Sequence, residues 1–349
     1  MDQNLKIPLV SVLMPVYNSE DYVAEAIESI LGQTYSNFEF LIVNDSSTDN
    51  SLEIISSYKD SRIRVLNMKQ NSGISKTLNF GIGEAKGKYI ARMDSDDKSF
   101  PERIKKQVEF LENNKNYILC GSNYKILNST YEVVLPENHS LIKTTLLSNC
   151  CIAHPTVMCK TEAIKKNNLH YSKESEPAED YHLWSFLISK GKFYNLQENL
   201  LEYRVHEKQI SQSKKAKQDK MSFSVKINYI KSFYKDISND EINILERLLL
   251  LNNKMKSKDI KIFSDYILKM KKINVETSFF NEMGFKNYTF KLENAFLKNY
   301  FSKYERYSCL DFLNYLKISR KHKLNFSYKN ATNLFFKSLF FYKIKTRSL

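Results

Sequence analysis

Glycine is scarce in this 349-residue chain. The sequence has eight glycines, and none of them forms a glycine-rich loop with a basic residue near the N-terminus. Loops of that kind hold phosphate groups in many nucleotide-binding proteins, because glycine lets backbone N–H groups approach an anion closely. The sequence therefore argues against phosphate binding through such a loop.

Patterned cysteines and long apolar runs are also lacking. The five cysteines form neither a C-x-x-C pair nor a regular framework, so we expect buried or free thiols in a reducing compartment. The apolar run at residues 7–16 contains Pro8 and Pro15 and follows no basic segment, which favours a strand over a signal peptide. No stretch is long enough to span a bilayer. We expect a cytoplasmic protein, with peripheral attachment to the inner face of the cell membrane left open.

The positive charge is confined to one end of the chain. Residues 214–349 carry 29 Lys and Arg against 12 Asp and Glu, a net charge of +17, whereas residues 1–213 carry 24 against 27, a net charge of −3. The length suits about two domains, and the charge-dense stretch at 211–220 is typical of a linker or lid. We therefore predict two domains, 1–213 and 214–349, and no nucleic-acid partner.

Strand-like and helix-like segments alternate in the front half. Four short apolar runs are separated by stretches with apolar residues at helical spacing, which predicts right-handed β-α-β units and an α/β domain with a mostly parallel central sheet. The runs lie at residues 9–14, 38–43, 62–66 and 89–93. Further along, the pattern predicts a helix at 101–113, less regular strands at 117–160, a last strand at 200–206, and C-terminal helices at 242–255 and 290–318.

Three of the predicted strands are followed directly by polar residues, at 15–18, 44–46 and 94–97. Because ligands of parallel sheets bind at the carboxyl ends of the strands, we expect these segments to converge. The last of them holds three aspartates, which repel one another unless a cation or donor groups share their charge. Such ligands suit Mg²⁺ or Mn²⁺ bridging to substrate phosphates. The alternative is a solvated turn, which Asp and Ser also favour.

Assembled in order, these segments resemble the family 2 glycosyltransferases, which are inverting enzymes of GT-A fold. The matching segments are residues 10–18, 27–35, 44–49, 87–97 and 179–180. The sequence departs from the family pattern at Asn44 and Ser46, which replace an Asp and a Gly but tolerate tight turns. It departs again at His182, where the family is often acidic. Residues 214–349 lie outside the resemblance.

The resemblance implies how a nucleotide sugar would be held. Pro15, Tyr17 and Asp45 would border the nucleobase. Asp94 and Asp96 would form a D-x-D element, with Asp94 toward the ribose and beside the metal, and with Asp96 as the main ligand of Mn²⁺ or Mg²⁺. The metal would offset the charge of the departing nucleoside diphosphate.

The resemblance also implies which residues would act on the acceptor and close over the diphosphate. Asp180 would be the general base that takes the proton from an acceptor hydroxyl, and Glu179 beside it would orient the acceptor or the base. Arg204 and His206 resemble a segment that closes over the diphosphate, and a basic group near a leaving phosphate is physically sensible. A lone histidine near a strand end is, however, more often a surface group.

Three further residues have a structural alternative. His154 is a candidate for hydrogen bonding to an acceptor sugar, with a purely structural role as its alternative. Trp184 is a candidate for stacking on a sugar, but core packing is favoured, because aromatic rings mostly stabilise through buried area. Arg92, just before the acidic cluster, is expected to pair with it.

The C-terminal region mixes Lys with Phe, Tyr and Leu, for example at 294–301 and 334–343. Such a mixture suits the interface of an anionic membrane. A helical bundle with solvated lysines, or a surface for partner proteins, is the alternative.

The combined prediction is an inverting, metal-dependent glycosyltransferase that moves a sugar from a nucleotide-diphosphate sugar, with a UDP-sugar favoured, to a saccharide or lipid-linked saccharide in bacterial surface polysaccharide biosynthesis. One alternative is a nucleotide-sugar nucleotidyltransferase, which the scarcity of glycine-rich loops disfavours. The other is a non-catalytic carbohydrate-binding or scaffold protein, which the presence of Asp96 and Asp180 disfavours.

Overall fold

The computed structural model describes residues 10–207, 209, 214–302, 309–325 and 327–339. The chain divides into two compact units, residues 1–225 and residues 226–349. This division falls within helix α9 (Lys215–Phe233). The boundary after residue 213 stays a prediction.

The predicted linker at 211–220 needs a correction. Residues 211–213 lie outside the described residues, but residues 215–220 belong to α9 and are not a linker. High charge density does not oppose a helix when the residues are Lys, Ala and Gln, which have good helix propensity.

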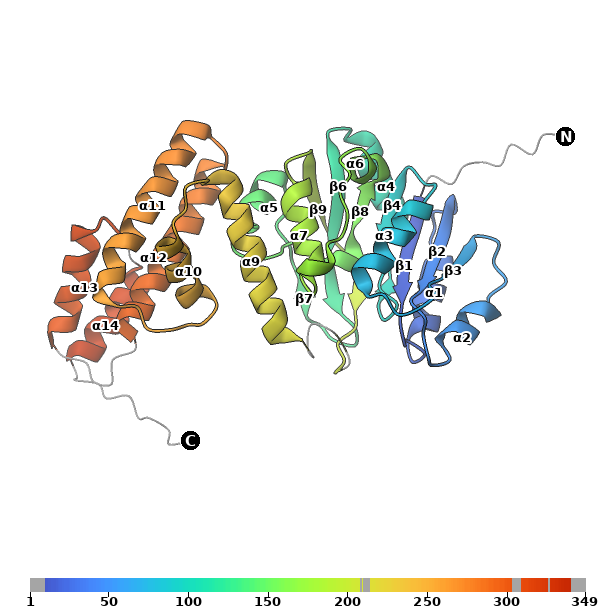
Figure 1. Ribbon diagram of the computed structural model, residues 1–349, viewed down its shortest axis with the longest axis horizontal. Helices are drawn as coiled ribbons and strands as arrows, with labels where there is room; N and C mark the ends of the chain where they lie inside the picture. The colour runs from blue at the N-terminus through green and yellow to red at the C-terminus, as the bar shows by residue number, and fades with distance from the viewer. Residues whose placement is uncertain (1–9, 208, 210–213, 303–308, 326, 340–349) are drawn as a thin grey trace. The chain divides into compact units, whose positions relative to one another are not determined.

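The first unit is built on one mixed sheet, which has nine strands in the part of the chain described. In chain order they are β1 (Val10–Val16), β2 (Phe38–Asn44), β3 (Ile63–Asn67), β4 (Tyr89–Arg92), β5 (Lys98–Ser99), β6 (Tyr117–Ile126), β7 (Glu132–Val133), β8 (Met158–Lys160) and β9 (Lys192–Tyr203). Their spatial order is β3-β2-β1-β4-β8-β6-β9-β5, with β7 beside β6 (Figure 1). β1 pairs in parallel with both β2 and β4, so the loops after these three strands leave the same edge of the sheet.

The predicted alternation of strands and helices is confirmed in this unit. Its helices are α1 (Val23–Leu31), α2 (Ser51–Ser57), α3 (Ile74–Glu84), α4 (Arg103–Asn113), α5 (His139–Thr145), α6 (Thr161–Lys165) and α7 (Glu179–Leu187), with short 3-10 turns η1 (His154–Thr156) and η2 (Lys173–Ser175). Helix α1 buries Val23, Ala26, Ile27 and Ile30, the apolar positions at helical spacing. Strands β1 and β2 are buried along their whole length, as expected for central strands of a parallel sheet.

The extra strands expected at 117–160 are present as β6, β7 and β8, and β8 runs antiparallel to β4. The last strand is longer than predicted. β9 begins at Lys192 rather than at residue 200, because Gln197, Glu198 and Asn199 interrupt its apolar pattern while its backbone still pairs with β6.

Gly87 precedes β4 and lies against the backbone of β1. Its N–H donates to the Ser11 hydroxyl over 2.8 Å, and a Cβ at this position would lie 2.4 Å from the Ser11 nitrogen and 2.7 Å from the Val10 carbonyl carbon. A central strand cannot move away from such a contact without breaking its pairing, so we expect Gly87→Ala to cost about 1–3 kcal/mol of unfolding free energy. Urea denaturation measures it.

The matched control is Gly83→Ala. Gly83 lies in α3, and no atom would meet its Cβ within 4 Å. Replacing a helical glycine should raise stability by about 0.5–1 kcal/mol. If both variants shifted the urea midpoint in the same direction, the contact between residue 87 and the β1 backbone would not explain the effect of Gly87→Ala on stability.

The second unit is helical, as predicted for the C-terminal region. Beyond α9 the helices are α10 (Asn239–Leu249), α11 (Ser257–Thr277), α12 (Glu282–Ser302), α13 (Cys309–Lys321) and α14 (Tyr328–Leu339). The Ser238 hydroxyl and the Glu241 carboxylate form a capping box at the start of α10. The rings of Phe263 and Phe296 stack 4.1 Å apart in the core between α11 and α12. Helix α10 ends at Leu249, before the predicted residue 255.

Within the described residues, no helix combines the length and apolar character that crossing a membrane requires.

Candidate active site

The loops after β1 and β2 are bound to each other. Pro15 is buried within β1, and Tyr17 directly follows the strand with 48% of its surface exposed. Asn18 and Ser46 both adopt left-handed backbone angles, with φ of 50° and 60°. The Asn18 side-chain oxygen accepts from the backbone N–H of Thr48 over 2.8 Å. The predicted convergence of these two loops is confirmed.

Asp45 anchors the start of helix α3. Its two carboxylate oxygens accept from the backbone N–H groups of Ser72 and Gly73, over 2.8 and 2.9 Å, and only 4% of the residue is exposed. Gly73 has a φ of 87°, an angle that favours glycine. The Asp45 carboxylate therefore fixes the backbone just before α3. Its contact with a nucleobase stays a prediction.

The loop after β4 gathers three carboxylates. One oxygen each from Asp94, Asp96 and Asp97 lies within 4.8 Å of the others. Asp97 is buried, and its Oδ2 has no hydrogen-bond partner among the described residues. Burial, reinforced by the two neighbouring aspartates, raises the pKa of Asp97 well above its ordinary value. Carboxylates held this closely, with one buried oxygen unsatisfied, fit a hard divalent cation such as Mg²⁺ or Mn²⁺.

Arg92, the last residue of β4, connects this loop with the acceptor side. It is 6% exposed and forms an ion pair with Asp94, so the predicted pairing is confirmed. Burial raises the pKa of Asp94, and the positive charge of Arg92 opposes the shift. The same charge opposes the burial-driven rise in the pKa values of Glu179 and Asp180. The positive charge of Arg92 thus lowers the pKa values of Asp94, Glu179 and Asp180 relative to the effect of burial alone.

The segment after β9 fastens the acidic loop. The Arg204 side chain donates from Nε to the Asp96 carbonyl oxygen over 2.7 Å, and its backbone N–H donates to the Asp97 carboxylate over 2.9 Å. The His206 Nε2 atom lies 3.0 Å from Asp96 Oδ2. Both residues therefore contact the acidic cluster directly, and their contact with a diphosphate stays a prediction.

Two residues at the start of α1, Tyr22 just before the helix and Glu25 in its first turn, were missed by the sequence analysis. The Arg204 guanidinium lies 3.2 Å from the Glu25 carboxylate and 4.8 Å from the centre of the Tyr22 ring. The Tyr22 ring also contacts the His206 ring, with 4.8 Å between centroids. No local motif marks Tyr22 or Glu25, because their role depends on β9, which pairs with β5 just after the acidic loop and brings Arg204 and His206 to this place.

Glu179 and Asp180 open helix α7. Asp180 is half-buried, accepts from the Tyr181 backbone N–H over 2.6 Å, and has the Cys150 sulfur 3.8 Å from its second oxygen. Burial raises its pKa. Glu179 is only 9% exposed, and burial together with the Asp180 charge raises its pKa to about 8. Burial therefore favours the protonated form of Glu179 near neutral pH. Sequence analysis saw Cys150 only as a thiol and missed its contact with Asp180.

His154 and Trp184 belong to a buried aromatic cluster. His154 Nε2 lies 2.8 Å from the Tyr171 hydroxyl, and the His154 and Trp184 rings meet edge to face with 5.9 Å between centroids. Trp184 is 1% exposed and packs in the core, as the favoured interpretation predicts, and stacking of this ring on a sugar stays an untested prediction. For His154 the structure shows the structural contact, and a role toward the acceptor stays a prediction.

The raised pKa of Glu179 makes stability depend on pH. Between its ordinary pKa of 4.5 and about 8, the unfolded chain releases the proton that the folded chain keeps. Stability should therefore fall as the pH rises through this window, by an amount on the order of a few kcal/mol, and change little outside it through this residue. Glu179→Gln removes that titration and should flatten the curve. Urea midpoints at pH 5 and pH 8 for both proteins measure this, and equal slopes would contradict it.

Comparison with known proteins identifies the family. The model of glycosyl transferase family 2 matches residues 11–199. An uncharacterized glycosyltransferase of Haemophilus influenzae is 32% identical over 277 residues, which cover 75% of this chain and 85% of that protein.

Solved structures show the same fold. The crystal structure of S. aureus TarS in complex with UDP-GlcNAc covers 93% of this chain and 90% of its own at a TM-score of 0.55 and 20% identity. The mannosyltransferase PcManGT of Pyrobaculum calidifontis, in complex with GDP-Man and Mn²⁺, covers 86% of this chain and 89% of its own at a TM-score of 0.53 and 15% identity. The fold is GT-A, and the chain belongs to the family 2 glycosyltransferases.

Proposed function

We propose that this glycosyltransferase is an inverting, metal-dependent enzyme that transfers a sugar from a nucleotide-diphosphate sugar, a UDP-sugar first among them, to a saccharide acceptor during assembly of a bacterial surface polysaccharide. The proposal rests on one observation above all: the loop after β4 gathers carboxylate oxygens of Asp94, Asp96 and Asp97 within 4.8 Å of one another, and the buried Arg92 pairs with Asp94 beside them. We place the donor at this loop and the base at Asp180, at the start of α7. The surface-polysaccharide setting rests on the family resemblance.

The donor half of the proposal rests on the acidic loop. Asp96 and Asp94, with the unsatisfied oxygen of Asp97, would hold Mn²⁺ or Mg²⁺. A cation bound there would offset charge on the departing nucleoside diphosphate. Arg204 and His206 already contact Asp96, so they are placed to steady the loop as a donor binds. Tyr17 is exposed at the end of β1, where a nucleobase can stack on its ring.

The acceptor half rests on a difference between two neighbouring acids. Glu179 is less exposed to solvent than Asp180, and burial together with the Asp180 charge favours its protonated form, so Glu179 is the weaker candidate for a base. We assign the base to Asp180, which would take the proton from an acceptor hydroxyl. Its raised pKa brings it closer to the working pH, where general bases are most effective. Attack from the face opposite the diphosphate would invert the anomeric carbon.

The choice of a UDP-sugar is supported by the TarS complex with UDP-GlcNAc, whereas PcManGT was solved with GDP-Man. The experiment is a donor panel of UDP-, GDP- and dTDP-sugars incubated with saccharide acceptors and Mn²⁺, with and without EDTA. We expect nucleoside diphosphate to be released from a UDP-sugar and the release to stop with EDTA. Release of pyrophosphate from a nucleoside triphosphate would point to a nucleotidyltransferase, and absence of any turnover to a binding protein.

We also propose that the C-terminal unit touches an anionic membrane surface and keeps the enzyme at the inner face of the cell membrane, near lipid-linked acceptors. The supporting observation is a set of exposed apolar side chains on two basic helices, Leu310 and Leu313 on α13 and Phe336 and Leu339 on α14. Part of the predicted aromatic segment, residues 340–343, lies outside the described residues. Flotation with phosphatidylglycerol vesicles tests this, and a chain that stays unbound would contradict it.

A further inference from the structure

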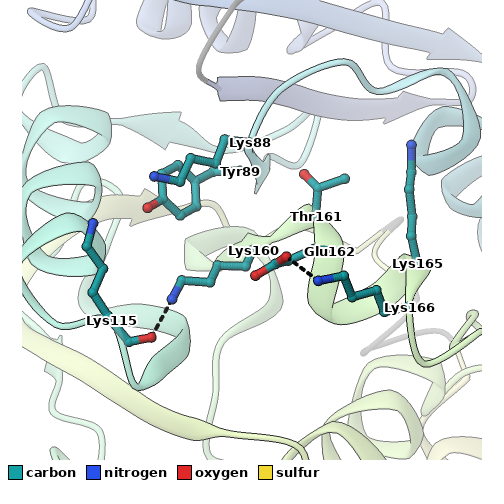
Figure 2. Close-up of a pocket in the computed structure, with 8 residues that line it drawn as sticks. All are labelled: Lys88, Tyr89, Lys115, Lys160, Thr161, Glu162, Lys165 and Lys166. Atoms are coloured by element: carbon teal, nitrogen blue, oxygen red, sulfur yellow. Dashed lines mark hydrogen bonds and ion pairs between the residues drawn. The ribbon is translucent and has the colours of Figure 1, made fainter.

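A cavity lies at the opposite end of β4 from the acidic loop. It has a volume of about 750 Å³ and is lined by Lys88, Tyr89, Lys115, Lys160, Thr161, Glu162, Lys165 and Lys166 (Figure 2). Lys88 immediately precedes β4 and the acidic loop follows it, so the four-residue strand separates the two places by ~13 Å at the usual rise per residue. Nothing in the proposed transfer reaction uses these residues.

Five of the eight lining residues are lysines, which come from three separate parts of the chain. Figure 2 shows their side chains around one space, with Glu162 among them. Two carboxylates partly offset this charge. Glu162 pairs with Lys166 over 2.9 Å, and Glu112, next to the cavity, accepts from both Lys88 and Lys115 over 2.5 Å. Five ammonium groups against two carboxylates leave a surplus of positive charge.

The surplus is concentrated on Lys160 and Lys165. Among the described residues, neither of them forms an ion pair: the Lys160 ammonium donates to the Lys115 carbonyl oxygen over 2.6 Å, and the Lys165 ammonium to the Ala85 carbonyl oxygen over 3.1 Å. An ammonium group has three donors, so each retains capacity for an acceptor. A neutral carbonyl also stabilises a cation less than an anion does.

Lys160 makes the cavity more than a group of surface lysines. It lies at the end of β8, and only 9% of it is exposed. Burial lowers its pKa, and the charges of Lys115 and Lys88 lower it further, while Glu162 and Glu112 act in the opposite direction. Placing a cation among like charges with one neutral partner is costly unless an anion shares the site.

The floor of the cavity is rigid. Tyr89 is fully buried and donates its hydroxyl to Glu112 over 2.8 Å, while the Thr161 hydroxyl donates to the Gly87 carbonyl oxygen over 2.7 Å. These groups are already satisfied within the protein, so recognition would come from the ammonium groups. Lysine binds phosphate as a point charge, whereas the planar guanidinium of arginine forms two parallel hydrogen bonds with a carboxylate or a phosphate.

We propose that this cavity is a binding site for a multiply charged phosphate group, held by Lys160 and Lys165 with Lys88 and Lys115 at its rim. The phosphate can belong to a small soluble molecule or to a lipid headgroup, since both present the same oxygens to the lysines. The site is separate from the proposed donor site, and its occupation needs no divalent cation.

The test is calorimetric titration of inorganic pyrophosphate into the 349-residue chain in EDTA, which removes any metal-dependent binding at the acidic loop. We expect the double variant Lys160→Met, Lys165→Met to weaken binding at least about tenfold, since it removes two charge-assisted contacts. The single variant Lys165→Met, on the exposed face of α6, should show part of the loss without disturbing β8. The control is Lys59→Met with Lys105→Met, two exposed lysines outside the cavity, which should bind like the wild type.

A second arm separates the two sources of phosphate. Flotation of the same proteins with phosphatidylglycerol vesicles should be unchanged by the cavity variants if the ligand is soluble, and lowered by them if the ligand is a headgroup. Unchanged flotation supports the site only together with weakened pyrophosphate binding, and lowered flotation supports it when the control pair behaves as wild type. If Lys165→Met and the double variant change neither pyrophosphate binding nor flotation, or if the control pair changes them equally, the proposal is overturned.

Discussion

Asp180→Asn should slow sugar transfer by about 10²–10⁴-fold while leaving UDP binding unchanged. An amide has nearly the same shape as the carboxylate but cannot take a proton, and a positioned general base contributes a factor of this size. The backbone N–H of Tyr181 can still donate to the remaining oxygen, so the start of α7 should stay intact. Initial rates of UDP release with donor and acceptor, and calorimetric affinity for UDP with Mn²⁺, measure the two quantities.

The matched control is Glu174→Gln. Glu174 is an exposed carboxylate on η2, a few residues before α7, and its partner is the Ser172 hydroxyl. It should transfer sugar at the wild-type rate. If Asp180→Asn did so as well, the base would lie elsewhere. If the variant lost UDP binding together with turnover, Asp180 would be supporting the fold of the site.

Asp96→Asn should abolish most of the effect of Mn²⁺ on UDP binding. In the proposed site Asp96 is the main metal ligand, and exchanging its carboxylate for an amide removes a negative charge that the cation needs. Since changes in groups that only support metal ligands cost 10–100-fold, we expect a loss of at least about 100-fold in Mn²⁺-dependent UDP affinity. Titrations of UDP at fixed Mn²⁺, and again in EDTA, measure the difference.

Glu53→Gln serves as the control for this variant, because Glu53 is exposed on α2 and has no part in the acidic loop. It should leave the Mn²⁺ dependence as it is. A titration in which Asp96→Asn bound UDP with the same Mn²⁺ dependence as the wild type would remove the acidic loop from the metal site. The Asp96 contact with His206 would then be its main role.

The local sequence pattern was sufficient to predict the strands and helices of the first half of the first unit. The apolar run that becomes β1 and the stripe of Val23, Ala26, Ile27 and Ile30 on α1 are each encoded by neighbouring residues, so the alternation could be read directly. Parallel pairing then dictated that the loops after β1, β2 and β4 share one edge. The pairing of Arg92 with Asp94 followed from adjacency along the chain.

Contacts between distant segments could not be predicted in the same way. Glu25 meets Arg204 only because β9 returns beside β6 and brings its last residues to the acidic loop. The raised pKa of Glu179 depends on its burial, which the sequence alone does not reveal. Trp184 was ambiguous for the same reason, since a tryptophan one turn beyond Asp180 can face either the cavity or the core.

The clearest test is diffraction from crystals grown with UDP and Mn²⁺, with data collected at the manganese absorption edge. We predict one anomalous peak at bonding distance from Asp96 and at least one of its two neighbouring aspartates, with the diphosphate on its other side. Asp180 should then face the position of the sugar from the side opposite the diphosphate. A manganese peak away from the loop after β4, or Asp180 opening into a separate cavity from the nucleotide, would contradict the single shared site.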